Sequence, residues 1–374
     1  MLRRIIDYFK NEERAKDAVS WRAVSSHYPR TEREAEQLSA VFACVDVISS
    51  AIASLPVAVK NRENEIVDHE INELIDSGKI NPWQTWSDLM QFYLGQVLIL
   101  GNALVDVRYK RGRLVGLWPI PWGNVSVYQL ASGRLRYDFP IYPYGNVYPQ
   151  SMEGNKGYGV LKRKDDQVLH LRDRSDDGIT GMSRLARSGV VIDHGHDLQS
   201  VSALFWRNGV FPSGALSVPG RIGKDTRALL KQDIASEFSG TQNIAKVLVL
   251  DQGASWTQTS IDPDKAEILD SRRFTVEEIC RLYNVPPPLI QEYSHNTFTN
   301  SEAAGRWFAQ FTLASWIRKI EHVLNRGLLF SSELHFDFDM SSFLRGDHKT
   351  RWEAHKISIE TGVYSPEEVK AMES

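Results

Sequence analysis

The chain has 374 residues, of which 42% are hydrophobic and 24% are charged. This composition is that of a folded globular protein and excludes a disordered or fibrous chain, and the length allows two or three domains. The formal net charge of −3 excludes the basic excess by which many proteins grip DNA phosphates tightly. Any contact with nucleic acid is therefore expected to be local or loose.

The N-terminal half predicts a mixed α+β region. The N-terminal 17 residues predict a short amphipathic helix and lack the cleavage site of a secretory signal. Apolar residues recur at helical spacing from Val41 to Leu55, with Pro56 ending the run, and a second helix is expected from about Ser87 to Leu100, closed by Gly101. The segments ALVDVRY and RLVGLWPIP around a KRG turn predict a hairpin, and VSVYQL, RLRYDF and QVLHLRD predict further strands. Tyr137 to Pro149, rich in Tyr, Pro and Gly, is expected to be an ordered loop.

Two features of this half bear on the compartment. The most apolar window, 89–107, carries Gln91, Gln96, Asn102 and Asp106, so it predicts a buried helix and strand rather than a membrane span. Cys44 and Cys280 are far apart in sequence and lie in apolar helical patterns. Two buried thiols are therefore expected, rather than a disulfide or a metal pair, as is typical of a reducing compartment.

The second half predicts long helices around a small insert. Ser183 is a suitable N-cap for a helix that ends at Asn208-Gly209 and would be about 39 Å long. FPSGALSVPG then breaks the helix. A short helix (225–238) and strands at AKVLVLD and SWTQTSI complete the insert, and a further helix runs from Asp264 to Tyr283.

Three consecutive prolines, Pro286 to Pro288, end that helix, because proline lacks a backbone donor and disfavours the helical conformation of the preceding residue. A polar and aromatic loop, QEYSHNTFTNS, follows, and another long helix is expected to begin near Asn300. Its predicted apolar positions are Ala304, Trp307, Phe308, Phe311, Ala314, Ile317, Ile320, Leu324 and Leu328. The strand and turn LHFDFDMSSF, a helix over 346–360 and a terminal helix capped by Ser365-Pro366 complete the chain.

Taken in order, eight short blocks of this sequence resemble the phage portal protein family, in the branch typical of long-tailed, siphovirus-type phages. The blocks are DGITGMSRL, WRNGVFPSGAL, FSGTQNIAKVLVLDQG, SIDPD, RRFTVEEICRLYNVPPPLI, FTNSEAAGRWF, LNRGLL and FDFDMSSFLRGD. Each block alone is weak, but their shared order over about residues 40–370 is specific. The sequence departs from the family where Arg184 replaces a frequent Pro, and where Gln291 replaces a frequent Gly after Leu289-Ile290.

The resemblance implies an α+β portal fold that assembles into a closed ring, usually of twelve subunits, at one capsid vertex. It implies a mixed α/β wing, long stem helices, a small α/β clip and a helical crown. We expect an N-terminal arm (1–29), the wing (30–182, completed by a long helix and strand at 301–342), stem helices (183–210 and 263–284), the clip (211–262), a tunnel loop (285–300) and crown-like helices (343–374).

Elementary geometry is compatible with such a ring. Twelve helices packed about 10 Å apart give a circumference of about 120 Å and an axial diameter of about 38 Å. Subtracting the thickness of one helix leaves an opening of about 28 Å, through which a duplex roughly 20 Å wide passes. A mildly acidic chain suits a conduit, since tight phosphate contacts would hold DNA rather than let it slide.

The resemblance also suggests functional surfaces and partners. The tunnel loop would touch the DNA backbone weakly, through Tyr293, Ser294, His295, Asn296, Thr297 and Phe298; an ordinary surface loop joining two helices is the alternative. Arg272 and Arg273 of the stem would face DNA or, preferably, pair with acids of a neighbouring subunit. The clip would offer Lys224, Arg227 and Lys231 to the large terminase or a head–tail adaptor. The major capsid protein is a further expected partner, a membrane is not, and the ring would be assembled in the host cytoplasm and reside in the virion.

Other residue patterns suggest chemistry less specifically. His335, Asp337 and Asp339 share one strand face and could ligate a metal, as in a metal-dependent nuclease or phosphotransferase; a solvated strand face backed by Phe336 and Phe338 is the simpler interpretation. Asp193, His194, His196 and Asp197 are split between helix faces and predict a solvated or intersubunit surface.

The glycine-containing segments do not complete a nucleotide site. GRIGKD (220–225) lacks a glycine at Val218 and has Asp225 where a phosphate-binding loop needs Ser or Thr, and GYG (157–159) lacks a third glycine. The chain is therefore expected to be the seat of a packaging motor rather than its ATPase, with no cofactor, resident metal or catalytic residue; a monomeric scaffold or adaptor is a further alternative. Trp118, Trp122, Trp206 and Trp307 are expected to be core or subunit-interface anchors.

Overall fold

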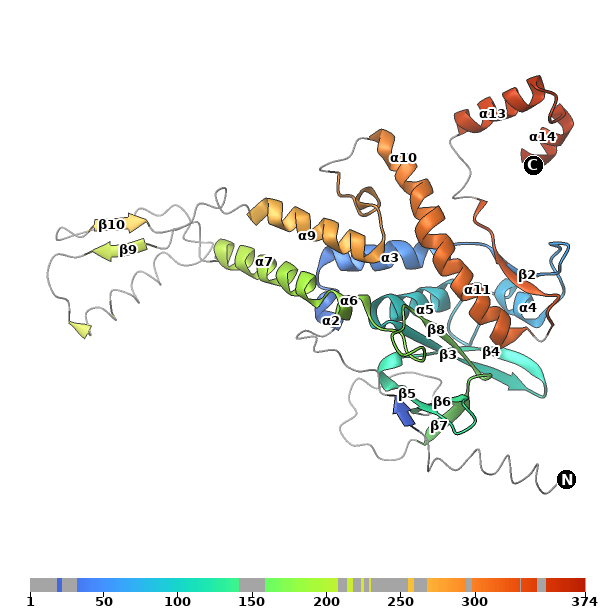
Figure 1. Cartoon of the computed structure of the whole chain (residues 1–374), viewed down its shortest axis with the longest axis horizontal. Helices are drawn as coiled ribbons and strands as arrows, with labels where there is room; N and C mark the ends of the chain where they lie inside the picture. Colours follow the sequence, from blue (N-terminus) through green and yellow to red (C-terminus); the bar gives the residue numbers. More distant parts are fainter. Residues whose placement is uncertain are drawn as a thin grey trace. The chain divides into compact units, whose positions relative to one another are not determined.

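The computed structural model describes residues 19–21, 32–140, 159–207, 214–217, 223–224, 229, 255–258, 268–293, 298–329, 331–341 and 348–373. It contains two compact units (Figure 1). The first unit comprises Met1–Tyr28, Ser39–Arg187 and Cys280–Ser374, and the second comprises Pro29–Leu38 and Ser188–Ile279. Each unit is thus assembled from segments that are distant in sequence.

Two helices of fifteen residues organise the first unit. Helix α3 (Ser39–Ala53) buries the face predicted from its apolar spacing, and α5 (Trp86–Leu100) lies against strands of the sheet. Thr85 and Asp88 form a reciprocal capping box at the start of α5. Gly101 ends it in the left-handed conformation at φ 77°, as the sequence predicts. The shorter helices α2 (Glu32–Ala35) and α4 (Glu70–Asp76) lie before α3 and α5 in the chain.

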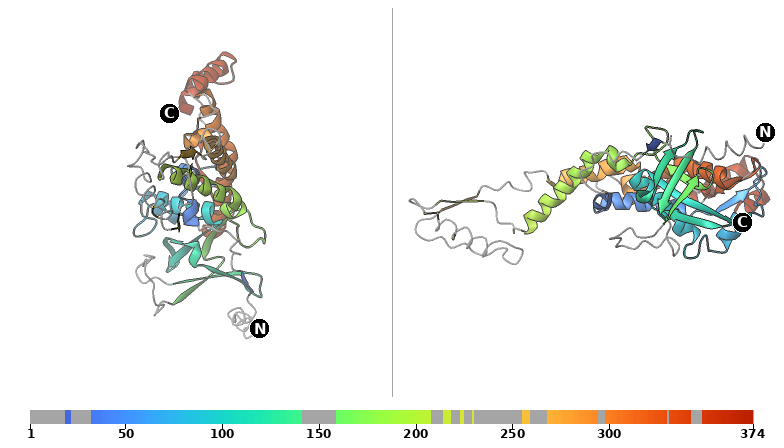
Figure 2. Two further views of the ribbon diagram at one scale, coloured as in Figure 1. Left: turned by 90° about the vertical axis from the view of Figure 1, so that its left-hand side faces the viewer. Right: turned by 90° about the horizontal axis from the view of Figure 1, so that it is seen from below.

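Antiparallel strands form the sheets of this unit (Figure 2). Strands β3 (Asn102–Lys110), β4 (Arg113–Ile120) and β8 (Val168–Arg172) pair in the order β4-β3-β8. The predicted hairpin is confirmed, and its two-residue turn holds Arg111 and Gly112 at φ 53° and 82°, as a type I′ turn requires.

A second sheet pairs in the order β1-β5-β6-β7. Its strands are β1 (Val19–Trp21), β5 (Ser126–Gln129), β6 (Leu135–Pro140) and β7 (Val160–Lys164). The expected loop from Tyr137 is wrong for its first four residues, which belong to β6; residues 141–149 lie outside the described part. Strand β7 was missed because VLKRK carries a charge pattern rather than an apolar alternation.

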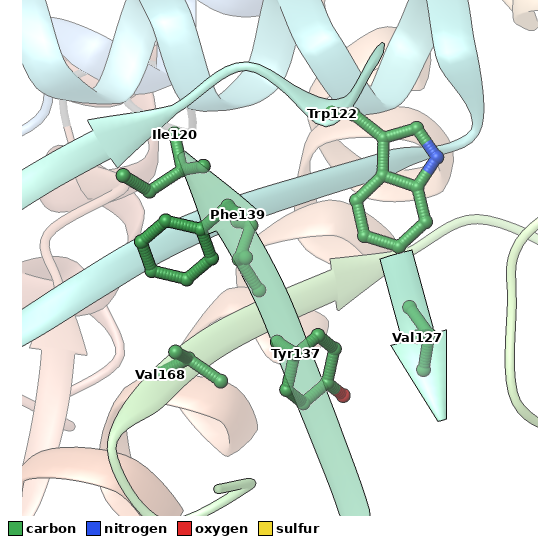
Figure 3. Packing of buried hydrophobic residues seen from close by; sticks show 7 residues of the cluster. Ile120, Trp122, Val127, Tyr137, Phe139 and Val168 are labelled. Carbon is green, nitrogen blue, oxygen red and sulfur yellow. The ribbon is translucent and has the colours of Figure 1, made fainter. Parts of the chain in front are cut away.

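The two sheets share a cluster of buried apolar side chains, shown in Figure 3. Trp122, in the short 3₁₀ helix η2 (Trp122–Asn124), packs in this cluster with Tyr137 and Phe139 of β6. Burying a large apolar side chain stabilises a fold by about 1.5–3 kcal/mol. The other members are Leu104, Ile120, Val127 and Val168. Trp118 and Trp122 are both buried, as expected of anchors.

A third pairing joins residues far apart in the chain. Strand β2 (Val57–Lys60), which the sequence did not predict, pairs antiparallel with β11 (His335–Phe338), so that Val59 lies opposite Phe336. Phe336 and Phe338 are buried, as predicted for the packed side of this strand.

The predicted helix from Ser183 is broken near its start. The structure has α6 (Arg184–Arg187), an interruption at Ser188, and α7 (Gly189–Arg207). The single uninterrupted helix is therefore wrong, because Ser-Gly pairs are weak helix formers at which helices kink. The N-cap prediction is confirmed, since the Ser183 hydroxyl accepts a hydrogen bond from Ala186 N at 3.4 Å.

The insert is described only in part. β9 (Gly214–Ser217) pairs antiparallel with β10 (Ser255–Gln258), so FPSGALSVPG contains a strand as well as the expected break. SWTQ confirms the predicted strand there, whereas the predicted helix 225–238, apart from Leu229, and the strand AKVLVLD lie outside the described residues. Helix α9 (Ile268–Tyr283) follows, and α7 and α9 meet where Gly195 lies against Thr275.

The C-terminal part is helical. A 3₁₀ helix η4 (Pro287–Ile290) precedes α10 (Phe298–Trp307), a π-helix η5 (Phe308–Leu313) and α11 (Ala314–Leu328), and α13 (His348–Glu360) and α14 (Pro366–Glu373) follow β11. Ser365 and Glu368 form the expected cap of the last helix. Within the described ranges, no helix combines the length and hydropathy that crossing a bilayer requires.

Candidate functional site

The described segment that follows α9, residues 284–293, changes the direction of the chain and is called the elbow below. It begins with a Schellman cap. Asn284 adopts the left-handed conformation at φ 58°. Its N–H donates to Arg281 O at 3.2 Å, and the N–H of buried Val285 donates to Cys280 O at 2.9 Å. These two bonds satisfy the last carbonyls of the helix. The helix thus ends through Asn284, before the prolines, which corrects the prediction that the prolines themselves terminate it.

The prolines instead build the next turn of the elbow. Pro286 is extended, and Pro287 opens the 3₁₀ helix η4, where its fixed φ and missing donor cost nothing. Gln291 closes η4 in the left-handed conformation at φ 65°. This is the position at which the resemblance expected Gly, the residue that adopts this conformation without strain. Three prolines and two left-handed residues therefore leave the described part of the elbow little conformational freedom.

A π-helix holds the base of the elbow. Ala314 N–H bonds to Ala309 O, five residues back, and Thr312 of this wide turn is only 3% exposed. The Thr312 hydroxyl donates to Asn284 O at 2.5 Å and accepts from Asn284 Nδ2 at 3.1 Å. Single π turns are rare and often occur at functional positions. Here the wide turn supplies a polar side chain to the capped end of α9.

Arg184 joins three elements at the same end of α9. Its Nε donates to Asp173 Oδ2 at 2.6 Å and its Nη1 to Leu282 O at 3.0 Å, while its guanidinium lies 5.4 Å from the Trp316 ring centroid. A cation at a helix C-terminus also interacts favourably with the helix dipole. Lys319 approaches the same carboxylate at 3.8 Å. The sequence marked Arg184 only as a departure from the family, and no local pattern revealed this role.

Two glycines let the loop that leads into α6 lie against the turn after α5. A Cβ built on Gly101 would lie 2.5 Å from Met182 C, and one built on Gly181 would overlap Gly101 O. Asp173 N donates to Gly101 O at 2.9 Å. Any side chain at either position would push the two backbones apart, so this close approach requires glycine at both.

A polar network continues from these glycines into the sheet. The Asn102 side chain bonds Gly181 through both its amide atoms, at 2.7 Å each. His170 Nε2 lies 3.1 Å from Asn102 Oδ1, and His170 Nδ1 lies 3.0 Å from the Tyr137 hydroxyl. The ring also stacks on Trp122, with centroids 4.9 Å apart.

This environment keeps His170 neutral. Burial first, and the charge of Arg172 second, lower the pKa of His170 to about 3. Burial also raises the pKa of Tyr137 to about 12. The network is thus uncharged at neutral pH and serves to fix the loop that precedes α6.

The same loop is held by Asp177, which begins the DGIT block. Its carboxylate accepts hydrogen bonds from Ile179 N, Thr180 N and the hydroxyls of Thr180 and Ser175, all between 2.7 and 2.8 Å. These bonds outweigh the effect of burial and lower the pKa of Asp177 to about 2. The sequence block used for the resemblance is therefore a tight, fully bonded turn.

The predicted tunnel-loop residues are only partly described. Tyr293 lies at the end of the elbow with 52% of its surface exposed. Phe298 is the first residue of α10, so the loop ends earlier than expected and the following helix begins two residues before Asn300. Ser294, His295, Asn296 and Thr297 lie outside the described residues.

The predicted stem and clip cations are likewise only partly described. Arg272 and Arg273 are both exposed on α9, and Arg273 pairs weakly with Asp270 at 3.4 Å on its own helix. Lys224 is exposed, whereas Arg227 and Lys231 fall outside the described part of the chain.

The residues of the metal alternative have other partners. Lys60 Nζ donates to Asp337 Oδ2 at 2.6 Å across the β2–β11 pair, and Asp339 lies beyond the strand, where its carboxylate accepts from Ser341 N. Across the residues that the structure describes, three or more metal-ligating side chains do not gather anywhere. The strand face is thus an ion-paired surface.

The histidine-rich part of α7 is less exposed than predicted. His196 is only 6% exposed, and its Nε2 has no hydrogen-bond partner among the described residues. The neighbouring Gly195 is also buried and lies against Leu38 and Thr275. A solvated surface is therefore wrong for His196, although His194 and Asp197 are exposed.

The two cysteines meet in the core of the first unit. Cys44 and Cys280 are both buried and reduced. A hydrogen bond between the two thiols, together with burial, raises the pKa of Cys44 well above its usual range. They are buried packing residues, as the prediction of two buried thiols requires, although their proximity was not foreseen.

Comparison with known proteins now defines the family. Residues 39–374 match the family model described as "Phage portal protein", so the chain belongs to the phage portal protein family. It is 28% identical over 360 residues to the probable portal protein of Streptomyces phage phiC31, which covers 92% of this chain and 76% of the relative. It is 25% identical over 351 residues to the portal protein of Enterobacteria phage HK97, covering 89% and 78%.

Solved structures share the fold. One is a chain from the neck of an empty GTA (gene transfer agent) particle computed with C6 symmetry, with a TM-score of 0.65, 20% identity, and coverage of 96% of this chain and 95% of that one. Another is an HK97-family phage portal protein from Corynebacterium diphtheriae, with a TM-score of 0.56, 14% identity, and coverage of 84% and 96%. The α+β portal fold expected from the sequence is confirmed, and the chain is a portal protein of a phage head.

Proposed function

We propose that twelve copies of the chain form a closed ring at one capsid vertex, and that double-stranded DNA enters and leaves the head through it. Membership of the portal family over residues 39–374 carries this proposal. A similar fold in a particle neck computed with C12 symmetry supports a ring of this size. A head-to-tail interface that closes on itself produces such a ring.

In this ring, α7 and α9 serve as stem helices, and the segment 285–300 serves as the tunnel loop. The formal net charge of −3 favours sliding over tight phosphate binding. The Asn284–Thr312 anchor and the Arg184 contacts would hold the base of the loop while its tip, from Tyr293 onward, touches passing DNA. The chain would act through shape and position, without catalytic residues or cofactors of its own.

The ring would also be the docking platform of the packaging machinery. We infer that Lys224, Arg227 and Lys231 of the clip meet acidic surfaces of the large terminase during packaging and of a head–tail adaptor afterwards. The wing would meet the major capsid protein, and assembly would take place in the host cytoplasm before the ring becomes part of the virion.

The first test is the mass of the assembled protein. Native mass spectrometry of the purified chain should give a closed ring of twelve 42.5 kDa subunits. Electron microscopy of the same sample should show a central opening wider than a duplex. A single subunit mass under all assembly conditions would contradict the ring, and an assembly without an opening would contradict the conduit.

The second test concerns the tunnel loop. Deleting residues 292–298 should leave ring assembly intact but reduce the DNA packaged or retained per head. The matched control shortens the exposed turn at residues 62–64, which joins β2 to the following segment. Normal packaging and retention by the loop-deletion variant would refute the role of the loop.

The alternative function, a metal-dependent nuclease, has its own test. It would show a nuclease activity that a chelator inhibits and that Asp337→Ala abolishes.

A further inference from the structure

An aromatic pair on the outer side of the α10–η5 segment has no place in the core of the first unit. Trp307 is 42% exposed and Phe311 is 51% exposed, although both are apolar positions of the expected helix. For Trp307 the sequence left the core and a subunit interface open as alternatives. Their rings contact each other with centroids 5.2 Å apart. Exposed aromatic residues that form a contiguous patch typically mark an interaction surface, and tryptophan is enriched among the residues that dominate binding energy.

The π-helix is what turns the pair outward. Four of its six residues, Phe308, Ala309, Thr312 and Leu313, are buried, and Thr312 is fixed by its two hydrogen bonds to Asn284. This anchorage fixes the rotation of the segment about its axis. Phe311 is therefore held in solvent by a hydrogen-bonded backbone, and the exposure of the pair is built into the fold.

The rim of this patch is basic. Arg306 precedes the pair and Arg318 follows it two to three turns later, and both are exposed, as is the intervening Gln310. A surface that covers the pair should therefore combine an apolar side chain with an acidic one. Helix α3 of the same unit offers such a surface, since Phe42 is 58% exposed and Asp46, one helical turn later, is exposed on the same face.

We propose that Trp307 and Phe311 of one subunit dock against the Phe42–Asp46 face of α3 in the next subunit. This inference rests on the proposed function, in which the subunits form a closed ring, and it specifies which two surfaces meet between neighbouring subunits. Because the two faces differ, each copy offers one face to each neighbour, as a head-to-tail ring requires. In this docking the aromatic pair supplies the apolar contact with Phe42, and the carboxylate of Asp46 would pair with the basic rim formed by Arg306 and Arg318.

The first experiment removes the aromatic face. Trp307→Ser combined with Phe311→Ser should leave the circular dichroism spectrum unchanged and raise the protein concentration needed for ring assembly by about 100-fold or more, measured by mass photometry. The matched control, Trp83→Ser combined with Ile66→Ser, removes two apolar residues of the same unit that are 47% and 69% exposed, and should assemble normally. Rings formed by the aromatic variant at the wild-type concentration would overturn the proposal.

The second experiment identifies the opposing face. Phe42→Cys combined with Phe311→Cys should, after mild oxidation of assembled rings, give a ladder of covalent oligomers on a denaturing gel. Neither single variant should give the ladder, and Trp83→Cys with Phe311→Cys should not either. Rings without a ladder, or a disulfide confined within one chain, would overturn the pairing while leaving the portal function intact. A wild-type protein that remains monomeric would overturn both.

Discussion

In the π-helix η5, two neighbouring residues on opposite sides of the segment reverse the distribution of polar and apolar residues that an ordinary amphipathic helix shows. On the inner side, Thr312 is 3% exposed and binds the capped end of α9, whereas its neighbour Phe311 on the outer side is 51% exposed. The inner side must satisfy a backbone carbonyl left by the end of a helix, which only a hydrogen-bonding residue can do. Hydrophobic spacing alone therefore mistakes the exposed Phe311 for a core residue.

The largest loss of stability should come from replacing Arg184, which bonds Asp173 and the end of α9 and lies over Trp316 of α11. Arg184→Met removes the main partner of Asp173, whose side chain is 6% exposed, and leaves a buried carboxylate poorly compensated. We expect a loss of about 3–5 kcal/mol in the free energy of unfolding, measured by denaturant titration. Arg184→Lys keeps the charge without the second bond to Leu282 O, and should lose less. Equal stability of Arg184→Met and wild type would contradict the anchoring role.

A pH titration tests the uncharged network behind the same loop. Because the pKa of His170 in the folded protein is about 3, below the usual 6.5, the unfolded chain takes up the proton first as the pH falls. The contribution of the neutral ring is complete above pH 6.5 and is lost as the pH falls from 6.5 toward 3. Between pH 7 and 5 the loss should be about 2 kcal/mol, a figure that requires only a folded-state pKa below 5.

The control for this titration is His170→Gln, which keeps hydrogen-bonding capacity but does not titrate. Its stability should vary less between pH 7 and 5 than that of the wild type. Parallel pH profiles of the two proteins would show that His170 is not the titrating group.

A smaller loss of stability is expected from substitutions in the π-helix. Thr312→Val keeps the shape of the side chain but leaves Asn284 O and Nδ2 without their partner, which should lower the free energy of unfolding by about 1–2 kcal/mol. Thr312→Ser, which keeps the hydroxyl, should lose clearly less. If both variants lost the same stability, methyl packing rather than the hydrogen bonds would explain the effect.

The smallest expected effect is a gain in stability, at Gln291. Gln291 adopts the left-handed conformation at φ 65°, so Gln291→Gly relieves a backbone cost of about 1 kcal/mol and should raise the melting temperature slightly. Gln291→Ala keeps the strained conformation with a shorter side chain and should not show the gain. A lower melting temperature for the glycine variant would mean that the Gln291 side chain itself stabilises the elbow.

The sequence by itself determined the elements whose signals are local. The Thr85–Asp88 capping box, the left-handed Gly101 and the Arg111-Gly112 turn are each set by neighbouring residues, and the helices and hairpin that they bound were predicted correctly. Local turn chemistry also accounts for the Asp177 turn within one of the blocks that point to the portal family. Such features need no tertiary partner, because their hydrogen bonds close within a few residues.

Only the tertiary structure decided the contacts that join distant segments. Strand β2 was missed because its partner β11 lies far along the chain, and Arg184 contacts Asp173, Leu282 O and Trp316, which lie on three separate segments of the chain. The close approach of Gly101 and Gly181, and the π turn that buries Thr312 while exposing Phe311, depend in the same way on what packs against them. Periodicity shows that a helix has an apolar side, but which residues that side buries is fixed by the neighbouring elements.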